Sequence, residues 1–419
     1  MSRAGLANSK NQPFWLASAL LCLTGGLVLA NENVLLPGDD GSAQMPVATE
    51  ESAVMPAAGP EPTVPLKDAV AVAPPGPQPL RMLGEEVPPG TSTRLNWVAT
   101  ELFEGVPVST PILVVNGSSP GPTLCLTAAI HGDELNGIEV VRRVMHEVDA
   151  DKLAGRVIGV PIVNLQGFRR GSRYLPDRRD LNRYFPGNPK GSAASRIAYS
   201  FFREVIVHCT ALVDLHTGSF ERANLPQLRA DLRDPDVVTL TKGFGATVIV
   251  HSGPAEGTLR YAAAAAGIPA VTLEAGGPSE LELAEVKHGV KGIETLLNTL
   301  GMMRKTRLWS DSEPVYYRSS WVRANRGGIL LSEVGLGSTV REGDLLGTIT
   351  DPISNDSTRL YSPYSGRVIG MARNQVVMPG FAAFHLGIQS DQTPSDDGEA
   401  DVASDEQGGS EDYVDGMSE

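Results

Sequence analysis

Basic and aromatic residues are scarce in this chain, which argues against a nucleic-acid-binding protein. Aromatic residues make up 5% of the 419 residues, and the formal net charge is −14. No basic run occurs, and no basic patch is interleaved with aromatic residues. Residues 391–419 hold seven Asp and four Glu without any Lys or Arg. The rest of the chain is therefore close to neutral, and its hydrophobic content suits a globular protein of one large or two moderate domains.

Cysteine is also scarce, since only three occur and Cys22 lies in an N-terminal apolar run. Cys125 and Cys209 are the two that remain. We expect both to be buried small hydrophobic residues. A disulfide between them is allowed outside the cytoplasm, but the sequence does not give their separation.

The chain has one long apolar run, at residues 14–30, preceded by Arg3 and Lys10 without an acidic residue. This pattern predicts a secretory signal peptide over residues 1–30, cleaved after Ala30, and an exported, periplasmic protein. The alternative is an uncleaved membrane anchor, because the run is at the lower limit of a bilayer span.

Residues 31–78 and 391–419 lack the periodic apolar pattern of a folded segment. The first is rich in Pro, Ala, Val and Glu, and we expect a disordered linker. The second is the acidic tail, which cannot bury enough apolar surface to fold alone. We expect a solvating extension there.

The segment HGDELN, from His131 to Asn136, contains the first candidate metal-binding residues. It lies between an apolar, strand-like run and a helix-like run. A His and a Glu three residues apart at a strand exit can bind one metal ion, and hydrolytic zinc sites commonly have two His and one Glu as ligands. His216, at the end of the apolar run ALVDLH, is the expected third ligand. Asp214 beside it could orient the imidazole.

Two further segments contain polar residues that could belong to the same site. DLNRYFPG spans residues 180–187, and VTLEAGG ends another apolar run with Glu274. HxxE, DLNR, a strand-end His and a strand-end Glu, in this order over residues 79–303, resemble the succinylglutamate desuccinylase and aspartoacylase family. That resemblance implies a zinc carboxypeptidase-like hydrolase with one Zn²⁺ per chain.

The pattern of residues 79–310 predicts an α/β catalytic domain with a mixed sheet flanked by helices. We expect strands over residues 124–130, 156–163, 211–215, 247–250 and 270–273, and helices over residues 136–146, 193–209, 259–266 and 280–303. Polar residues at several strand exits indicate a site at the carboxyl edge of the sheet.

Glu274 is the expected catalytic base, because a carboxylate at the end of a buried strand can have a raised pKa and exchange protons near neutral pH. In the family, an arginine just upstream of DLNR stabilises the charge that develops on the substrate oxygen. Arg173 matches that pattern best, and Arg178 and Arg179 are alternatives.

Asn182 and Arg183 resemble the pair that in this family binds a carboxylate of the substrate, and a planar guanidinium suits that task. The alternative for Arg183 is a structural pairing with Asp180. Arg260 could supply a second carboxylate contact, or it could be an arginine on a helix surface.

Residues 315–390 change to short apolar β-like runs with glycine turns, which predicts a small all-β domain, a barrel or sandwich similar to lipoyl or biotinyl carrier folds. No Lys occurs from residue 315 onward, so covalent carriage of a cofactor is excluded. A structural role or a role in covering the cleft is preferred, and Tyr361 and Tyr364 could enter the site.

Together these features predict a zinc-dependent amide hydrolase of the deacylase type. Its substrate would be a small N-acyl amino acid or peptide-like molecule that carries a carboxylate, cleaved by a metal-activated water. One alternative is an exported metallocarboxypeptidase that cleaves short or cell-wall peptides. Another is a non-catalytic binding protein on the same fold. No nucleic-acid partner is expected, and a membrane partner only if the N-terminal segment stays attached.

Overall fold

The computed structural model describes residues 76–103, 106–304 and 313–389. The expected signal peptide, nearly all of the expected linker and the acidic tail lie outside these residues. Within the described part, no helix combines the length and the apolar character needed to cross a membrane.

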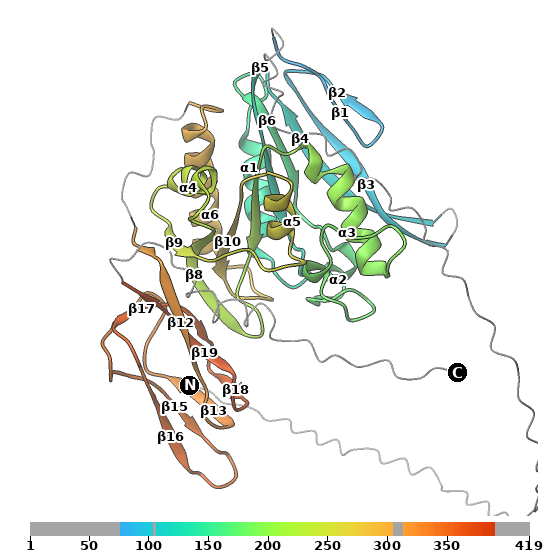
Figure 1. Ribbon diagram of the computed structural model, residues 1–419. Coiled ribbons are helices and arrows are strands. Elements are labelled where there is room, and N and C mark those ends of the chain that lie inside the picture. The colour runs from blue at the N-terminus through green and yellow to red at the C-terminus, as the bar shows by residue number, and fades with distance from the viewer. Residues whose placement is uncertain (1–75, 104–105, 305–312, 390–419) are drawn as a thin grey trace, which may run out of the picture. The chain divides into compact units, whose positions relative to one another are not determined.

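A mixed sheet of 13 strands is the frame of the described chain (Figure 1). Four neighbouring parallel strands form its centre, in the order β10 (Ala270–Gly276), β7 (Ala211–His216), β5 (Ser119–Ala128) and β6 (Ala154–Val160). β4 (Val106–Asn116) and β3 (Thr91–Phe103) continue the sheet antiparallel beyond β6. β7 and β10 are buried along their whole length, as expected for strands covered on both faces.

Helices cover both faces of this sheet. α3 (Ala193–Glu204) and α5 (Leu259–Ala265) contribute to one hydrophobic core. α1 (Asn136–Glu147), α4 (Pro235–Lys242) and α6 (Leu283–Thr299) contribute to the other. The short helices are α2 (Leu165–Phe168), η1 (Leu181–Arg183) and η2 (Ile206–His208). The predicted α/β class with a mixed, helix-flanked sheet is confirmed.

The predicted central strands and four helices are present, with shifted ends. The helix expected over residues 193–209 ends at Glu204, because Val205 leaves helical geometry, and η2 follows it. The helix expected over residues 280–303 begins at Leu283. Strands β3 and β4, and a strand β8 (Arg222–Ala230), were not predicted.

Cys125 and Cys209 form a disulfide, so the expectation of two separate buried thiols is wrong. Cys125 lies on β5, and Cys209 lies two residues before β7, which pairs with β5. This strand pairing brings together two cysteines that are 84 positions apart. The bond therefore links the two strands that lead to HGDE and to His216.

The C-terminal region is all-β, as predicted. Its strands β17 (Gly366–Ala372), β19 (Ala382–Ile388) and β12 (Arg318–Arg323) extend the main sheet, because β17 pairs with β8. A second sheet has the order β16 (Ser357–Tyr361), β15 (Leu345–Thr350), β13 (Gly328–Ser332) and β18 (Gln375–Val377). The two sheets share a core that contains Leu330, Ile349 and Phe384.

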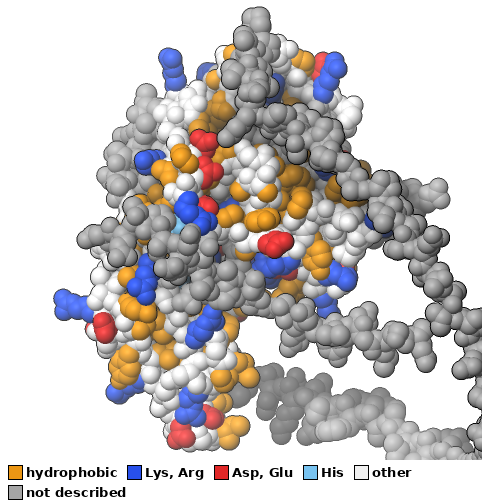
Figure 2. Space-filling view, viewed as in Figure 1, with side chains coloured by type: hydrophobic (Ala, Val, Ile, Leu, Met, Phe, Trp, Pro, Cys, Tyr) orange, Lys and Arg blue, Asp and Glu red, His pale blue; other side chains and the backbone are white. Residues whose placement is uncertain are grey.

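The remaining strands are short: β1 (Leu80–Met82), β2 (Glu85–Val87), β9 (Val248–His251), β11 (Val315–Tyr316) and β14 (Thr339–Val340). β9 pairs with β8 and with β11, which links the two parts of the chain a second time. Figure 2 shows hydrophobic side chains on the surface of the C-terminal strands, where Ile329, Leu331 and Val376 are exposed.

Candidate active site

Three neighbouring parallel strands bring the predicted site residues to one edge of the sheet. His216 is the last residue of β7 and lies beside Glu274 of β10. His131 follows β5, whose final residue Ala128 pairs with Leu215 of β7. Since parallel strands end at the same edge, these side chains are close although they are far apart in sequence.

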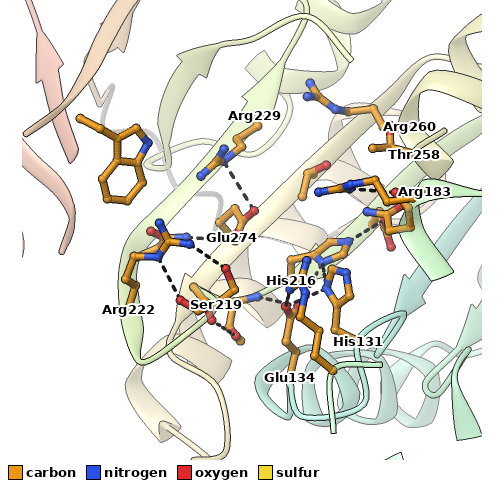
Figure 3. Close-up of a pocket in the computed structure, with 18 residues that line it drawn as sticks. His131, Glu134, Arg183, His216, Ser219, Arg222, Arg229, Thr258, Arg260 and Glu274 are labelled. Carbon is orange, nitrogen blue, oxygen red and sulfur yellow. Dashed lines mark hydrogen bonds and ion pairs between the residues drawn. The ribbon is translucent and has the colours of Figure 1, made fainter. Parts of the chain in front are cut away.

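The structure brings His131, Glu134 and His216 into one buried cluster (Figure 3). His131 Nδ1 lies 2.8 Å from Glu134 Oε1, and His216 Nδ1 lies 3.0 Å from Glu134 Oε2. The two Nδ1 atoms are 3.2 Å apart. All the potential ligand atoms lie within 4.8 Å of one another, so one ion could contact all three side chains.

A carboxylate lies behind each imidazole. His131 Nε2 is 3.1 Å from Asp180 Oδ1, and His216 Nε2 is 2.8 Å from Asp214 Oδ2. Thr127 Oγ1 donates to the other oxygen of Asp214 at 2.6 Å. A carboxylate that accepts a hydrogen bond from Nε2 fixes the imidazole so that Nδ1 is the free ligand nitrogen. Asp214 thus contacts the His216 imidazole as predicted, and Asp180 makes the equivalent contact with His131.

The carboxylates control the protonation of this cluster. Burial disfavours the charged form of His216, but Asp214 and Glu134 outweigh burial and raise its pKa well above the usual value. Burial disfavours the charged form of Glu134 too, but the two imidazoles lower its pKa below the usual range. The protein groups thus create a site that attracts positive charge, supplied by protons or by a cation.

The donor set fits a hydrolytic zinc centre. Two imidazoles and one carboxylate are a common set of protein ligands for catalytic zinc, with a fourth position left for water or substrate. The three side chains are at most 6% exposed, and each imidazole has a carboxylate partner. His131, Glu134 and His216 are therefore the residues that would hold the ion.

Glu274 lies in the same pocket and contacts two side chains of β8. Asn224 Nδ2 donates to Glu274 Oε2 at 3.0 Å, and Arg229 Nε lies 3.5 Å from Glu274 Oε1. Burial raises the pKa of Glu274, although Arg229 opposes this shift. A raised pKa is the property expected of a carboxylate that exchanges protons near neutral pH.

Among the three candidate arginines, Arg173 is the one that lines the pocket. Its Nη1 lies 3.3 Å from Glu134 Oε1, and its Nη2 donates to Asp180 Oδ2 at 3.0 Å. Arg178 and Arg179 are exposed, and Arg179 pairs with Asp177. Arg173 is therefore the arginine that lies next to the candidate metal ligands.

The predicted carboxylate-binding residues Asn182, Arg183 and Arg260 also line this pocket. Asn182 Oδ1 accepts from the backbone N–H of Leu259 at 2.8 Å, which holds η1 against α5. Arg183 Nη1 donates to its neighbour's carbonyl oxygen at 2.9 Å. Arg260 is 4% exposed and donates to the Ser252 carbonyl at 2.8 Å, so it is not on a helix surface.

The sequence pattern missed one wall of the pocket. Arg222, Asn224 and Arg229 come from β8, which was not predicted, and Trp321 comes from β12 of the C-terminal region. Through Trp321, the C-terminal region therefore forms part of the pocket wall. Tyr361 and Tyr364 are not among the residues that line this pocket.

Comparison with known proteins places this geometry in a family. Residues 120–300 match the family model of the succinylglutamate desuccinylase/aspartoacylase catalytic domain. N-alpha-acetyl-L-2,4-diaminobutyric acid deacetylase of Halomonas elongata is 30% identical over 261 residues, which cover 58% of this chain and 75% of the relative. Succinylglutamate desuccinylase of Pseudomonas aeruginosa is 36% identical over 138 residues, 30% of this chain and 38% of that enzyme.

Solved structures agree with the sequence comparisons. The succinylglutamate desuccinylase/aspartoacylase structure from Rhodobacter sphaeroides has a TM-score of 0.65 at 25% identity, covering 72% of this chain and 96% of that one. The product-bound ectoine utilization protein EutE from Ruegeria pomeroyi shares the fold, with a TM-score of 0.64 at 24% identity and coverage of 75% and 99%. The chain belongs to the succinylglutamate desuccinylase/aspartoacylase family.

Proposed function

We propose that this protein is a zinc-dependent amide hydrolase that removes the acyl group from a small N-acyl amino acid or peptide-like substrate carrying a carboxylate. The observation that carries the proposal is the convergence of His131, Glu134 and His216 beside Glu274 in one pocket. The deacylating relatives support the same reaction type.

The two imidazoles and Glu134 would hold the ion through Nδ1, Nδ1 and the carboxylate. When bound, zinc acts as a Lewis acid that polarises a carbonyl and lowers the pKa of water. Asp180 and Asp214 keep both imidazoles oriented during the reaction.

Glu274 accepts a proton from the attacking water and passes it to the leaving amine nitrogen. Asn224 holds one of its oxygens, so the other is positioned for proton transfer. Arg173 is fixed by Glu134 and Asp180. A guanidinium held in this way stabilises the negative charge that develops on the amide oxygen, without having to move.

Arg183 binds the carboxylate of the substrate, because a guanidinium donates two parallel hydrogen bonds to it. Asn182 and Arg260 hold this wall in place through Leu259 and the Ser252 segment. A carboxylate fixed on this wall orients the scissile amide toward Glu274.

The protein acts outside the cytoplasm in this proposal, most simply in the periplasm. The apolar run at residues 14–30 supports export. The disulfide supports it too, because such bonds persist in oxidising compartments.

The test is turnover by the purified, zinc-loaded protein on a panel of N-acyl amino acids and short peptides, with the released amine measured by mass spectrometry. We expect release from carboxylate-bearing N-acyl amino acids. Glu274→Gln should keep its zinc and lose that release. A zinc-loaded wild type that turns over no amide, while both proteins bind the same ligands, would instead identify a binding protein.

A further inference from the structure

The turn between β17 and β18, residues 373–374, contacts the loops that follow β7 and β10. The backbone N–H of Arg373 donates to the Glu221 carbonyl at 2.9 Å, in the loop between β7 and β8. The Arg373 guanidinium contacts the loop between β10 and α6, where Nη1 donates to Glu280 at 2.8 Å and Nη2 to Glu282 at 2.6 Å. One arginine of the C-terminal region therefore contacts both loops.

Glu282 connects Arg373 to the segment that contains Glu134. Its Oε1 accepts from Arg373, and its Oε2 accepts from the Gly277 backbone N–H at 2.9 Å and from Asn136 Nδ2 at 3.3 Å. The backbone N–H of Glu282 donates to Asn136 Oδ1 at 2.8 Å. Asn136 is the first residue of α1, two positions after Glu134. A continuous series of hydrogen bonds thus runs from the C-terminal region to the HGDELN segment.

Asn136 also holds the end of the strand that carries Glu274. Its Nδ2 donates to the Ala275 carbonyl at 3.0 Å, and the residue is 1% exposed. Gly276 comes next with a φ of 76°, and a Cβ at this position would overlap the Glu282 carboxylate and the Asn136 amide. Because these groups are in such close contact, a displacement of Glu282 passes to the backbone beside Glu274.

Two backbone hydrogen bonds join the same loop, residues 277–282, and its start to the other site segments. The Ser279 N–H donates to the carbonyl of Asp133, inside HGDELN, at 2.8 Å. The Gly218 N–H, two positions after the end of β7, donates to the Gly276 carbonyl at 2.9 Å. The loop between β10 and α6 therefore contacts all three segments that supply candidate ligands and the base.

The two carboxylates that bind the Arg373 guanidinium differ in exposure. The Arg373 and Glu282 side chains are 28% and 29% exposed, whereas the Glu280 side chain is 64% exposed. The guanidinium lies against Gly277, where an added Cβ would come within 2.7 Å of Nη2. Because water screens an exposed ion pair strongly, the contact with Glu282 holds the arginine more firmly than the contact with Glu280.

We propose that Arg373 is a positioning residue for the hydrolysis. It acts through Glu282 and Asn136. Together they fix the distance between the base Glu274 and the candidate ligand Glu134, which lie in one pocket (Figure 3). The inference rests on the proposed function, which assigns these two roles. A base must lie within hydrogen-bond reach of the proton that it accepts, and a misplacement of about 1 Å is enough to slow a reaction strongly.

The experiment measures kcat, KM and zinc content for wild type, Arg373→Gln, Glu282→Gln and the double variant, with an N-acyl amino acid that the wild type cleaves. Arg373→Gln should lower kcat by about 10- to 100-fold, the effect of a misplacement of about 1 Å. KM should stay within about threefold, as for a loss confined to the transition state, and the zinc content should not change.

Glu282→Gln should cause a similar loss of kcat, and the double variant should lose no more than either single variant, because all three break the same contact. Losses that multiply in the double variant would show that the two residues act independently, which contradicts the proposal. A loss of zinc that accounts for the loss of kcat would also contradict it.

Glu280→Gln is the matched control, because Glu280 binds the other terminal nitrogen of the same guanidinium from an exposed position. It should change kcat by less than about threefold, as expected for an exposed ion pair. Equal losses in Glu280→Gln and Glu282→Gln would mean that Arg373 only attaches the C-terminal region, and the positioning role would be wrong. Arg373→Lys keeps the charge and should lose less kcat than Arg373→Gln. It serves as the test variant if Arg373→Gln does not fold.

Amide hydrogen exchange separates this inference from the proposed function. Arg373→Gln and Glu282→Gln should speed exchange in residues 133–137 and 274–282 and leave α4 unchanged, because only the first two segments lose a support. This result supports the fixed geometry of the two segments even if the wild type hydrolyses no amide, in which case the hydrolase assignment alone fails. In an active enzyme, unchanged exchange, or faster exchange without a loss of kcat, would overturn the positioning role.

Discussion

Each candidate ligand imidazole is held by a carboxylate on its far nitrogen, and this pairing determines which nitrogen can meet a cation. Asp180 contacts Nε2 of His131, and Asp214 contacts Nε2 of His216. Because both Nε2 atoms are engaged, both Nδ1 atoms face Glu134. Asp180 also accepts hydrogen bonds from Arg173 and from the Asn182 backbone, so it connects the DLNR segment to the candidate metal ligands.

Asp180→Asn should weaken zinc binding by about 10- to 100-fold, the usual effect of losing a partner behind a ligand histidine. The reason is that His131 loses the negative charge that orients its ring and raises its basicity. Competition with a chromogenic chelator measures the dissociation constant. Asp177→Asn is the control, because Asp177 is exposed and pairs with Arg179. Unchanged zinc affinity in Asp180→Asn would show that the contact does not support the metal site.

Glu274→Gln should lower kcat by about 100- to 10,000-fold, the range for loss of a general base. Burial raises the pKa of Glu274, and the base must be deprotonated to act. Wild-type activity should therefore rise with pH through a pKa above that of an ordinary glutamate. A pH–rate profile measures this limb, and a limb that persists unchanged in Glu274→Gln would assign the titration to another group.

The positions of some of these residues in the site could be predicted from the sequence, whereas those of others depend on the fold. His131, His216 and Glu274 follow apolar β-like runs, so their meeting at one sheet edge could be anticipated. Asp180 reaches His131 only through the fold of the loop between Asn164 and η1. Arg229 faces the pocket beside Asn224 because of a register shift in strand pairing, which no local pattern encodes.

At the scale of elements, the disulfide joins β5 to the segment just before β7, and these strands end near two of the ligands. Removing it with the paired change Cys125→Ser and Cys209→Ser should lower the free energy of unfolding by about 2–4 kcal/mol, the typical effect for a long closed loop. Denaturant unfolding with and without a reductant measures the change. The reductant should lower the midpoint of the wild type and leave that of the double variant unchanged. A wild type insensitive to complete reduction would contradict a stabilising role.

The packing of β19 on β12 buries His385 without a hydrogen-bond partner among the described residues. Its ring stacks on Trp321 with centroids 4.5 Å apart. Burial, with Arg229 and Arg222 nearby, lowers the pKa of His385 well below its usual value of 6.5. The folded protein therefore keeps this imidazole neutral where the unfolded chain would protonate it.

The stability contributed by keeping His385 neutral should fall as the pH drops below about 6.5, because this imidazole then binds a proton in the unfolded state but not in the folded state. His208 and His288, whose pKa values burial also lowers, add to the same slope. His385→Gln should reduce the slope of unfolding free energy against pH between about 7 and 5. The exposed His146→Gln is the control. An identical slope in wild type and His385→Gln would show that His385 does not contribute.

At the scale of the whole molecule, one sheet runs through both the α/β part and the C-terminal strands. β17 pairs with β8, and β12 supplies Trp321 to the pocket. The sequence correctly predicted an α/β region followed by an all-β region, because the period of the apolar residues changes between them. It could not show that the two share a sheet, since that depends on pairing between β8 and β17, which are far apart in the sequence and meet at register pairs such as Asn224 with Gly370.

The N-terminal segment should direct export. The protein recovered from the periplasm of a producing cell should begin near Asn31, and deleting residues 1–30 should leave it in the cytoplasm. N-terminal sequencing of fractionated cells measures both outcomes. A periplasmic or membrane-bound product that retains residues 1–30 would favour the uncleaved anchor.

The central claim is that three side chains from distant segments hold one metal ion, and metal analysis tests it most directly. Purified wild-type protein should contain about one zinc ion per chain, and His216→Ala should contain much less, because two ligands bind zinc far more weakly than three. His146→Ala, at an exposed position of α1, should retain the wild-type content. Equal zinc in wild type and His216→Ala would remove His216 from the ligand set and contradict the account.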